Sequence, residues 1–258
     1  MKKSLKRGIV GFIRSLGYTV HKINNKYDNI AVELDDSDVD LIKYILDSGY
    51  TMISVPRLVN TLKSCRYVVE NKIPGDFVEC GVWRGGNGIL AKKLFNELDS
   101  RRCVWMFDTF KGMTEPTEFD IATPTKELAF QKYRTSQLET HNQWCYASLE
   151  DVHNNCKKSG LKVEDLRFVK GDVSKTLLEK QNLPNEISVL RLDTDWYEST
   201  KVELEMLYPI LNVGGVLIID DYGHWEGSRK AVDEYFSAME YKPLLNVIDY
   251  EGRTAIKM

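Results

Sequence analysis

Residues 76–86 read DFVECGVWRGG, and this stretch decides the fold class that the sequence predicts. Asp76–Val82 is a short apolar run of the kind that forms a buried strand. The glycines after it suit a tight turn, and a helical pattern follows from Gly86 to Leu98. A strand, a glycine-rich turn and a helix in this order predict the first unit of an α/β sheet.

The rest of the chain repeats this alternation of strands and helices. Further strands are predicted at Val104–Phe110, Leu166–Val173, Ser188–Asp195 and Gly214–Tyr222. Helical patterns are found at Ser148–Ser159, Ser199–Leu211 and Gly227–Met239. Two extended runs at the end of the chain predict a β-hairpin, and they are Pro243–Tyr250 and Arg253–Met258. The fold class predicted is therefore a doubly wound α/β sheet, parallel except for a terminal antiparallel hairpin.

The composition excludes several classes of protein. The chain has 258 residues, of which 43% are hydrophobic and 28% charged, as in ordinary globular proteins. Its 35 basic and 38 acidic residues give a net charge of −3, so no nucleic-acid partner is expected. No apolar run approaches the roughly 20 residues of a membrane span. Five cysteines without C-x-x-C spacing predict neither a disulfide framework nor a zinc site, and they fit a cytoplasmic location.

The first 50 residues are predicted to be a basic helical extension, followed by a single domain at 51–258. Residues 1–26 contain no acid, and their apolar residues give a helix one apolar face. Arg14 interrupts the apolar run, which argues against a secretory signal. Two interpretations stay open. The helix either makes a peripheral contact with the inner membrane face or packs on its own domain or a partner subunit, as in a homo-oligomer.

Residues 111–147 form a connection much longer than the roughly 2–6 residues usual in α/β units. Excess chain after the second strand is expected over the carboxyl edge of the sheet, where ligands bind in open α/β folds. The segment, called the insertion below, is therefore a candidate lid or acceptor-recognition element over the active site. The alternative is a disordered surface insertion.

Acidic residues end the first three predicted strands. Glu79 would repel a pyrophosphate but suits a cationic amine, and Asp108 can accept hydrogen bonds from ribose hydroxyls. Asp172 ends the third strand. This series suits a nucleoside joined to an amino acid, which favours S-adenosylmethionine over NAD. For any one of these acids, a helix cap or a solvated turn is the alternative.

The residues around these acids complete the predicted cofactor site. Glycines at the strand-to-helix turn allow close approach of a ligand to the backbone. Thr51 and Met52 are expected to close over the cofactor, and Phe110 either packs near the adenosine or belongs to the core. The predicted cofactor-binding residues are Thr51, Met52, Glu79, Gly81, Arg84, Gly85, Gly86, Asp108, Thr109, Phe110, Gly171, Asp172 and Val173.

Three more acids, Asp193, Asp220 and Asp221, end the fourth and fifth strands. If these strands are neighbours, the three like charges converge at one sheet edge, which is costly unless a cation holds them. Ligands that are all oxygen favour a hard ion such as Mg²⁺. Helix capping is the alternative, and it competes most strongly for Asp195, which lies just before the next helix.

Several segments agree in order with a known family, from about Thr51 to Phe236. They are Arg57–Asn60, Gly75–Glu79, Gly81–Gly86, Asp108–Gly112, Arg191–Asp193, Tyr197–Thr200, Leu207–Pro209, Gly214-Gly215, Asp220–Tyr222 and Arg229–Val232. The sequence thereby resembles the macrocin O-methyltransferase (TylF-like) family, whose members use S-adenosylmethionine and Mg²⁺ to methylate sugar hydroxyls. The resemblance implies a class I, Rossmann-like methyltransferase fold with strand order 3-2-1-4-5-7-6. It also implies a general base, Asp195, and three metal ligands, Asp193, Asp220 and Asp221.

Two positions depart from the family pattern. Thr194 stands where the family usually has glycine, and Trp196 where leucine is common. Both side chains are expected near the acceptor, so the resemblance does not carry the acceptor's identity. His224 follows the metal-binding strand and is a candidate second base or acceptor contact, with a hydrogen-bonded loop residue as the alternative.

Three functions are compatible with these residues. The first is an O-methyltransferase whose acceptor is a glycoside, nucleotide sugar or polysaccharide with vicinal hydroxyls. The acceptor would chelate Mg²⁺ through its vicinal hydroxyls, and Asp195 would deprotonate it. The second is a methyltransferase that acts on a catechol, which would also chelate the metal. The third is a catalytically silent nucleotide-binding scaffold protein, and the intact strand-end acids argue against it.

Overall fold

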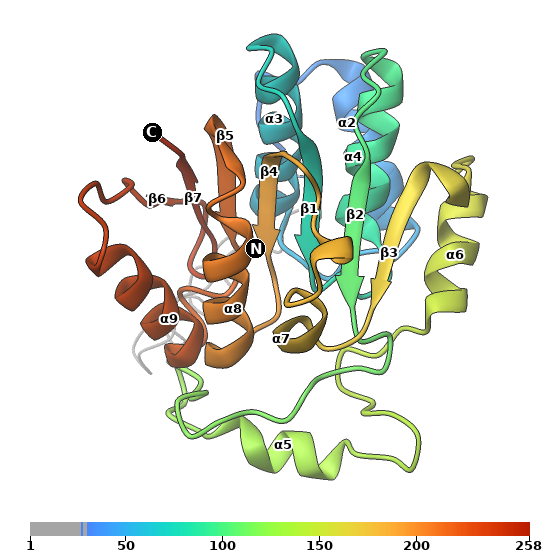
Figure 1. Cartoon of the computed structure of the whole chain (residues 1–258). Helices are drawn as coiled ribbons and strands as arrows, with labels where there is room; N and C mark the ends of the chain where they lie inside the picture. Colours follow the sequence, from blue (N-terminus) through green and yellow to red (C-terminus); the bar gives the residue numbers. More distant parts are fainter. Residues whose placement is uncertain (1–26, 28–29) are drawn as a thin grey trace, which may run out of the picture.

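The computed structural model describes residues 27 and 30–258, so the predicted helix within residues 1–26 lies outside the described residues. Seven strands form one sheet in the order β3-β2-β1-β4-β5-β7-β6 (Figure 1). This order is the one that the family resemblance implied. The strands are β1 (Asp76–Cys80), β2 (Val104–Asp108), β3 (Leu166–Lys170), β4 (Ile187–Leu192), β5 (Leu211–Ile219), β6 (Asn246–Val247) and β7 (Arg253–Ile256).

The first five strands are parallel, and β7 runs antiparallel to both β5 and β6. The predicted doubly wound sheet with a terminal antiparallel hairpin is therefore confirmed. The helices are α2 (Asp36–Asp47), α3 (Val55–Glu70), α4 (Gly86–Glu97), α5 (Ala129–Thr135), α6 (Leu149–Lys158), α7 (Val173–Thr176), α8 (Tyr197–Leu207) and α9 (Glu226–Ser237). Short 3₁₀ turns lie at Val163–Asp165 and Lys180–Asn182.

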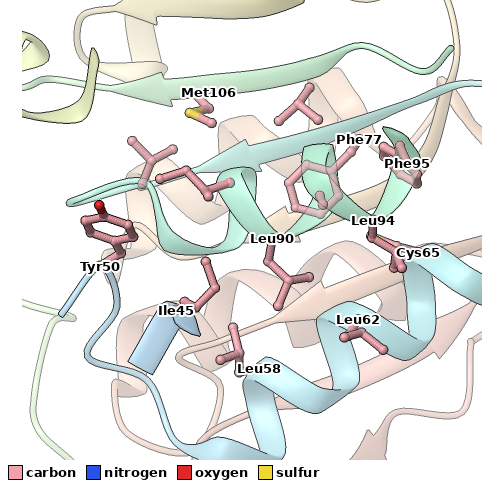
Figure 2. Close-up of a cluster of buried hydrophobic side chains, with 14 of the residues drawn as sticks. Ile45, Tyr50, Leu58, Leu62, Cys65, Phe77, Leu90, Leu94, Phe95 and Met106 are labelled. Carbon is pink, nitrogen blue, oxygen red and sulfur yellow. The ribbon is translucent and has the colours of Figure 1, made fainter. Parts of the chain in front are cut away.

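Helices cover both faces of the sheet. Alternate residues of a strand point to opposite faces, so Phe77 packs with α2, α3, α4 and α6 while Val78 packs with α7, α8 and α9. Figure 2 shows part of the first cluster, in which Leu58 and Leu62 of α3 face Leu90 and Leu94 of α4. In the described part of the chain, no helix is both long and apolar enough to cross a membrane.

Several predicted boundaries differ from the structure, and local chemistry explains two of them. The helix predicted to reach Leu211 ends at Leu207, because Pro209 cannot donate the next helical hydrogen bond. Leu211 instead begins β5, three residues before the predicted start. The first strand ends at Cys80, because Gly81 turns the chain with φ +81°.

The insertion is fastened to the carboxyl edge of the sheet, below the arrowheads of the strands in Figure 1. Asp120 is fully buried, and its carboxylate accepts hydrogen bonds from the backbone N–H groups of Tyr197 (2.8 Å) and Thr117 (2.7 Å). It thereby satisfies an N–H group of the first turn of α8. Ala122 also forms a β-bridge with Trp225, just before α9. The insertion is thus tied to the starts of both α8 and α9.

Candidate active site

A cavity of about 400 Å³ lies at the carboxyl ends of the parallel strands, with residues of the insertion in its wall. This is where ligands bind in open α/β sheets. The cavity brings together twelve of the residues predicted from the sequence as site residues: Met52, Gly81, Asp108, Thr109, Gly171, Asp172, Val173, Asp193, Asp195, Asp220, Asp221 and His224.

Six other predicted residues do not line this cavity: Thr51, Glu79, Arg84, Gly85, Gly86 and Phe110. Gly85 is the N-cap of α4, and Gly86 lies against Tyr50 and Thr51 so closely that a Cβ atom would come within 2.8 Å of Thr51 Cβ. Phe110 is 3% exposed and packs on Phe168, which is the core alternative stated for it. These six residues therefore do not form part of the cavity surface in the described structure.

Gly81 occupies the closest approach between the ends of β1 and β4. A Cβ atom on this residue would lie 1.8 Å from the carbonyl oxygen of Asp193, and its φ of +81° disfavours any side chain. The glycine therefore lets the carboxyl end of β1 lie directly beside the acids that follow β4.

The two acids at the ends of β2 and β3 also serve the local backbone. Asp108 accepts hydrogen bonds from the N–H groups of Val82 (2.8 Å) and Phe110 (2.7 Å), and burial raises its pKa. Asp172 caps α7 by accepting from the N–H of Ser174 at 3.0 Å. The capping alternative thus holds for Asp172, although both acids also line the cavity.

Glu79 is turned away from the cavity into a buried ion pair. It is 1% exposed, and it accepts hydrogen bonds from Arg191 (2.9 Å) and Asn87 (3.0 Å). Burial raises its pKa to about 7. Its Oε2 and the Oδ1 of Asn87 have no hydrogen-bond partner among the described residues. Two buried acceptors, one on β1 and one on α4, are therefore left without a donor in the described structure.

Asp193, Asp220 and Asp221 form the predicted acidic cluster. Each offers one carboxylate oxygen, and these oxygens all lie within 4.8 Å of one another. Burial and the neighbouring carboxylates, Asp195 foremost among them, raise the pKa of Asp221 well above its usual value. Three oxygen ligands this close together suit a hard divalent cation.

Two arginines, one fully buried and one partly buried, offset part of this charge. Arg191 is 0% exposed and contacts Asp193 (2.6 Å), Glu79 and Asp220. Arg57 contacts Asp220 as well. Arg57 is shared with two further acids of the hairpin turn, Asp249 at 3.1 Å and Glu251 at 2.6 Å.

No arginine is paired with Asp221 or Asp195 in the described part of the chain, so the two guanidinium groups leave the acids of the site in excess. This excess fits a bound cation. A role for these two arginines was not predicted from the sequence. The spacing of Arg191, two residues before Asp193 and so on the same face of the strand, could have indicated its role.

Asp195 lies beside the cluster in a left-handed conformation, with φ +69°. Its carboxylate accepts a hydrogen bond from the indole N–H of Trp225 (2.9 Å), and its own N–H donates to Asp221 (3.1 Å). Burial raises the pKa of Asp195 to about 6. His224 also reaches the cavity, with Nδ1 at 3.4 Å from a carboxylate oxygen of Glu251.

The cavity also has an apolar and aromatic wall, which was not predicted from the sequence. Met113 and Trp144 of the insertion line it together with Trp225. Thr194 lines the cavity as expected for a residue near the acceptor, but Trp196 is 2% exposed and lies behind the wall. The rings of Trp196 and Trp225 pack edge to face with centroids 4.9 Å apart. Trp144 and Trp225 lie 81 residues apart in sequence, so no local pattern revealed this wall.

One buried acid near the cavity predicts a pH-dependent stability. Glu203 is 0% exposed, accepts a hydrogen bond from the Thr194 hydroxyl at 2.8 Å, and has its pKa raised by burial to about 8. Between pH 4.5 and 8 the unfolded chain releases this proton while the folded chain keeps it, so stability falls as pH rises.

A glutamine at position 203 can still accept the hydrogen bond from the Thr194 hydroxyl, but it does not ionise. The stability advantage of Glu203→Gln over wild type should grow by about 3–4 kcal/mol between pH 5 and 8. Denaturant unfolding at several pH values measures this difference, with Glu205→Gln at an exposed position of the same helix as the matched control. An advantage that does not change with pH would contradict a protonated Glu203.

Comparison with known proteins identifies the family of the chain. The macrocin O-methyltransferase (TylF) family model matches residues 14–255. Demethyldecarbamoylnovobiocin O-methyltransferase from Streptomyces niveus is 36% identical over 207 residues, which are 80% of this chain and 74% of the relative. A Streptomyces olivaceus enzyme is 35% identical over 79% of this chain and 74% of its own. It is named as an 8-demethyl-8-(2,3-dimethoxy-alpha-L-rhamnosyl)-tetracenomycin-C 4'-O-methyltransferase.

A solved structure agrees with these sequence relatives. The O-methyltransferase NovP superposes with a TM-score of 0.71 at 35% identity, covering 81% of this chain and 82% of that chain. The match spans the strands that carry the acids of the cavity. The chain belongs to the macrocin O-methyltransferase (TylF) family and is an S-adenosylmethionine-dependent O-methyltransferase.

Proposed function

We propose that the protein transfers a methyl group to a sugar hydroxyl of a sugar-bearing natural product, with Mg²⁺ bound at the acidic cluster. The observation that carries the proposal is the juxtaposition of three carboxylates within 4.8 Å with a further, partly buried acid beside them. The names of the two relatives support a sugar-bearing acceptor, since one names a rhamnosyl group and both name O-methylation.

The residues of the cluster have separate tasks in this proposal. Asp193, Asp220 and Asp221 would hold the cation, and Arg191 keeps two of these carboxylates in place from behind. When bound, Mg²⁺ supplies a Lewis acid that lowers the pKa of a coordinated hydroxyl. Asp195 would receive the acceptor's hydroxyl proton, because it lines the cavity beside the cluster.

The reaction balances with these groups. The acceptor oxygen forms a bond to the methyl carbon, and the carbon–sulfur bond breaks with its electron pair going to sulfur. The hydroxyl proton goes to Asp195. The sulfonium is already a good methyl donor, so the chain must chiefly align the two substrates and remove the proton. The cofactor would lie between Gly81 and Asp172 along the strand ends, and the acceptor between Asp195 and the aromatic wall.

A catechol is the second candidate acceptor. The flat rings of Trp144 and Trp225 in the cavity wall suit an aromatic acceptor as well as the apolar face of a sugar. A catechol would also present two adjacent oxygens to a cation. Peripheral membrane contact through residues 1–26 and a homo-oligomeric state remain predictions.

An acceptor panel separates these candidates. Purified protein with Mg²⁺ and radiolabelled S-adenosylmethionine would be offered methyl α-L-rhamnopyranoside, TDP-rhamnose, demethyldecarbamoylnovobiocin and catechol. We expect transfer to at least one sugar-bearing compound and none to catechol. Transfer to catechol alone would favour the second candidate.

Binding without turnover is the third outcome of this panel. Calorimetry of S-adenosylmethionine binding, with NAD as control, shows whether the protein is competent. Tight binding of S-adenosylmethionine with no transfer to any panel compound would contradict the proposal and favour the silent scaffold. Binding of NAD instead would contradict the assignment of the strand-end acids.

A further inference from the structure

We propose that Trp225 is a positioning residue for Asp195, and that the insertion acts on the reaction through this single indole N–H group. The inference deepens the proposed function and rests on its assignment of Asp195 as the base. Trp225 Nε1 donates to Asp195 Oδ1 at 2.9 Å inside the cavity wall. Nothing in the sequence pattern assigned a role to Trp225.

Asp195 needs such a partner because of its surroundings. It follows β4 in a left-handed backbone conformation, and its carboxylate lies beside Asp221 and near Asp220. The like charge of Asp220 favours rotation of the carboxylate away from the cluster. In the part of the chain that the structure describes, the indole of Trp225 is the only N–H group that donates a hydrogen bond to this carboxylate.

An indole N–H suits this task better than a cationic side chain. It is a donor only, so it fixes the direction of one carboxylate oxygen without adding a positive charge. A lysine or arginine at the same place would form an ion pair and lower the basicity of Asp195. The second carboxylate oxygen is then left to face the acceptor, as a base requires.

Trp225 is itself held from three sides. Its backbone N–H donates to the carbonyl oxygen of Asp221 at 3.0 Å. Its ring packs edge to face on Trp196 at 4.9 Å and, tilted, on Trp144 at 6.0 Å. The side chain is 7% exposed, so little rotational freedom remains.

The insertion supplies much of this support. Thr123 donates from its backbone N–H to the carbonyl of His224 at 2.7 Å, and Glu226 donates to the carbonyl of Ile121 at 3.0 Å. These two bonds bracket Trp225 in sequence. Arg229 adds a third tie by donating to the hydroxyl of Thr123 at 2.7 Å. The insertion therefore fixes Trp225, and Trp225 fixes Asp195.

The first test detects the hydrogen bond itself and needs no acceptor. The chain has five tryptophans, so a ¹⁵N-labelled sample gives five indole signals, which single Trp→Phe variants assign. Asp195→Ala should move the Trp225 signal upfield and leave that of Trp105 in place. Asp76→Ala should do the reverse, because Trp105 Nε1 donates to Asp76 at 2.9 Å. A Trp225 signal that does not respond to Asp195→Ala would overturn the inference.

The second test asks whether the bond serves the reaction. Trp225→Phe keeps a ring in the wall and removes the donor, so kcat for the best panel acceptor should fall about 10–100-fold. The affinity for S-adenosylmethionine should stay within about twofold, because the bond does not contact the cofactor, and the KM of the acceptor should change less than kcat does. Trp105→Phe loses the same kind of bond at the far end of the sheet and should keep the wild-type kcat.

A double-mutant cycle separates this inference from the proposed function. In an Asp195→Asn background, Trp225→Phe should cause no further loss of kcat, because its effect passes through Asp195. A full additional loss would show that Trp225 acts independently and would overturn the inference. Wild-type kcat in Trp225→Phe together with a large loss of kcat in Asp195→Asn would also overturn the inference, but it would leave the base assignment intact. Full kcat in Asp195→Asn would remove the base and the inference together.

Discussion

Asp221→Asn should lower the rate of methyl transfer by about 10²–10³-fold while the affinity for S-adenosylmethionine stays unchanged. Asp221 is the acid of the cluster that has no arginine partner in the described structure, so its charge is the one most dependent on a cation. Asparagine has nearly the same shape but no charge. The loss should therefore appear in metal affinity and in rate, and not in folding.

Two measurements check this prediction. Calorimetry with Mn²⁺ as the probe should show at least tenfold weaker binding to Asp221→Asn. Asp233→Asn is a matched control, because Asp233 lies in α9, is not part of the acidic cluster, and accepts a hydrogen bond from the Tyr222 hydroxyl at 2.8 Å. This control should bind Mn²⁺ as wild type does. A wild-type rate for Asp221→Asn at limiting Mg²⁺ would refute the metal assignment.

Asp195→Asn should lower kcat by about 10²–10⁴-fold, the usual contribution of a general base. Asparagine can still accept the hydrogen bond from Trp225, so the local structure should be preserved. Affinities for Mn²⁺ and for S-adenosylmethionine should be close to those of wild type, since Asp195 is not among the three proposed ligands.

His224 provides the comparison for this variant. His224 also lines the cavity, and its ring Nδ1 lies 3.4 Å from Glu251, whereas its backbone N–H donates to the carbonyl oxygen of Asp221. His224→Gln should cost much less kcat than Asp195→Asn. The opposite order of the two losses would move the role of base from Asp195 to His224.

The acids of the site could be predicted because strand topology alone brings them together. Parallel strands have their carboxyl ends at one edge, so acids that end β1, β2, β4 and β5 must lie near one another. Glu79 shows the limit of this reasoning. It pairs with Arg191 because these two residues are neighbours in the register of β1 and β4, which the sequence does not specify.

The aromatic wall could not be predicted for a different reason. Trp144 lies in the insertion, and it meets Trp196 and Trp225 because the insertion is tied to the starts of both α8 and α9. No periodic pattern connects such distant residues. Trp196 illustrates the consequence, because its position in sequence indicated a contact with the acceptor and the structure places it behind the wall.

Removal and restoration of Mg²⁺ test directly whether methyl transfer depends on a metal ion. The rate of methyl transfer to the best panel acceptor would be measured in Mg²⁺, then in excess EDTA, and again after Mg²⁺ is restored. S-adenosylmethionine binding would be followed in the same samples. We expect that transfer falls to background in EDTA, that S-adenosylmethionine binding persists, and that restored Mg²⁺ returns the rate. An unchanged rate in EDTA would contradict a metal at Asp193, Asp220 and Asp221.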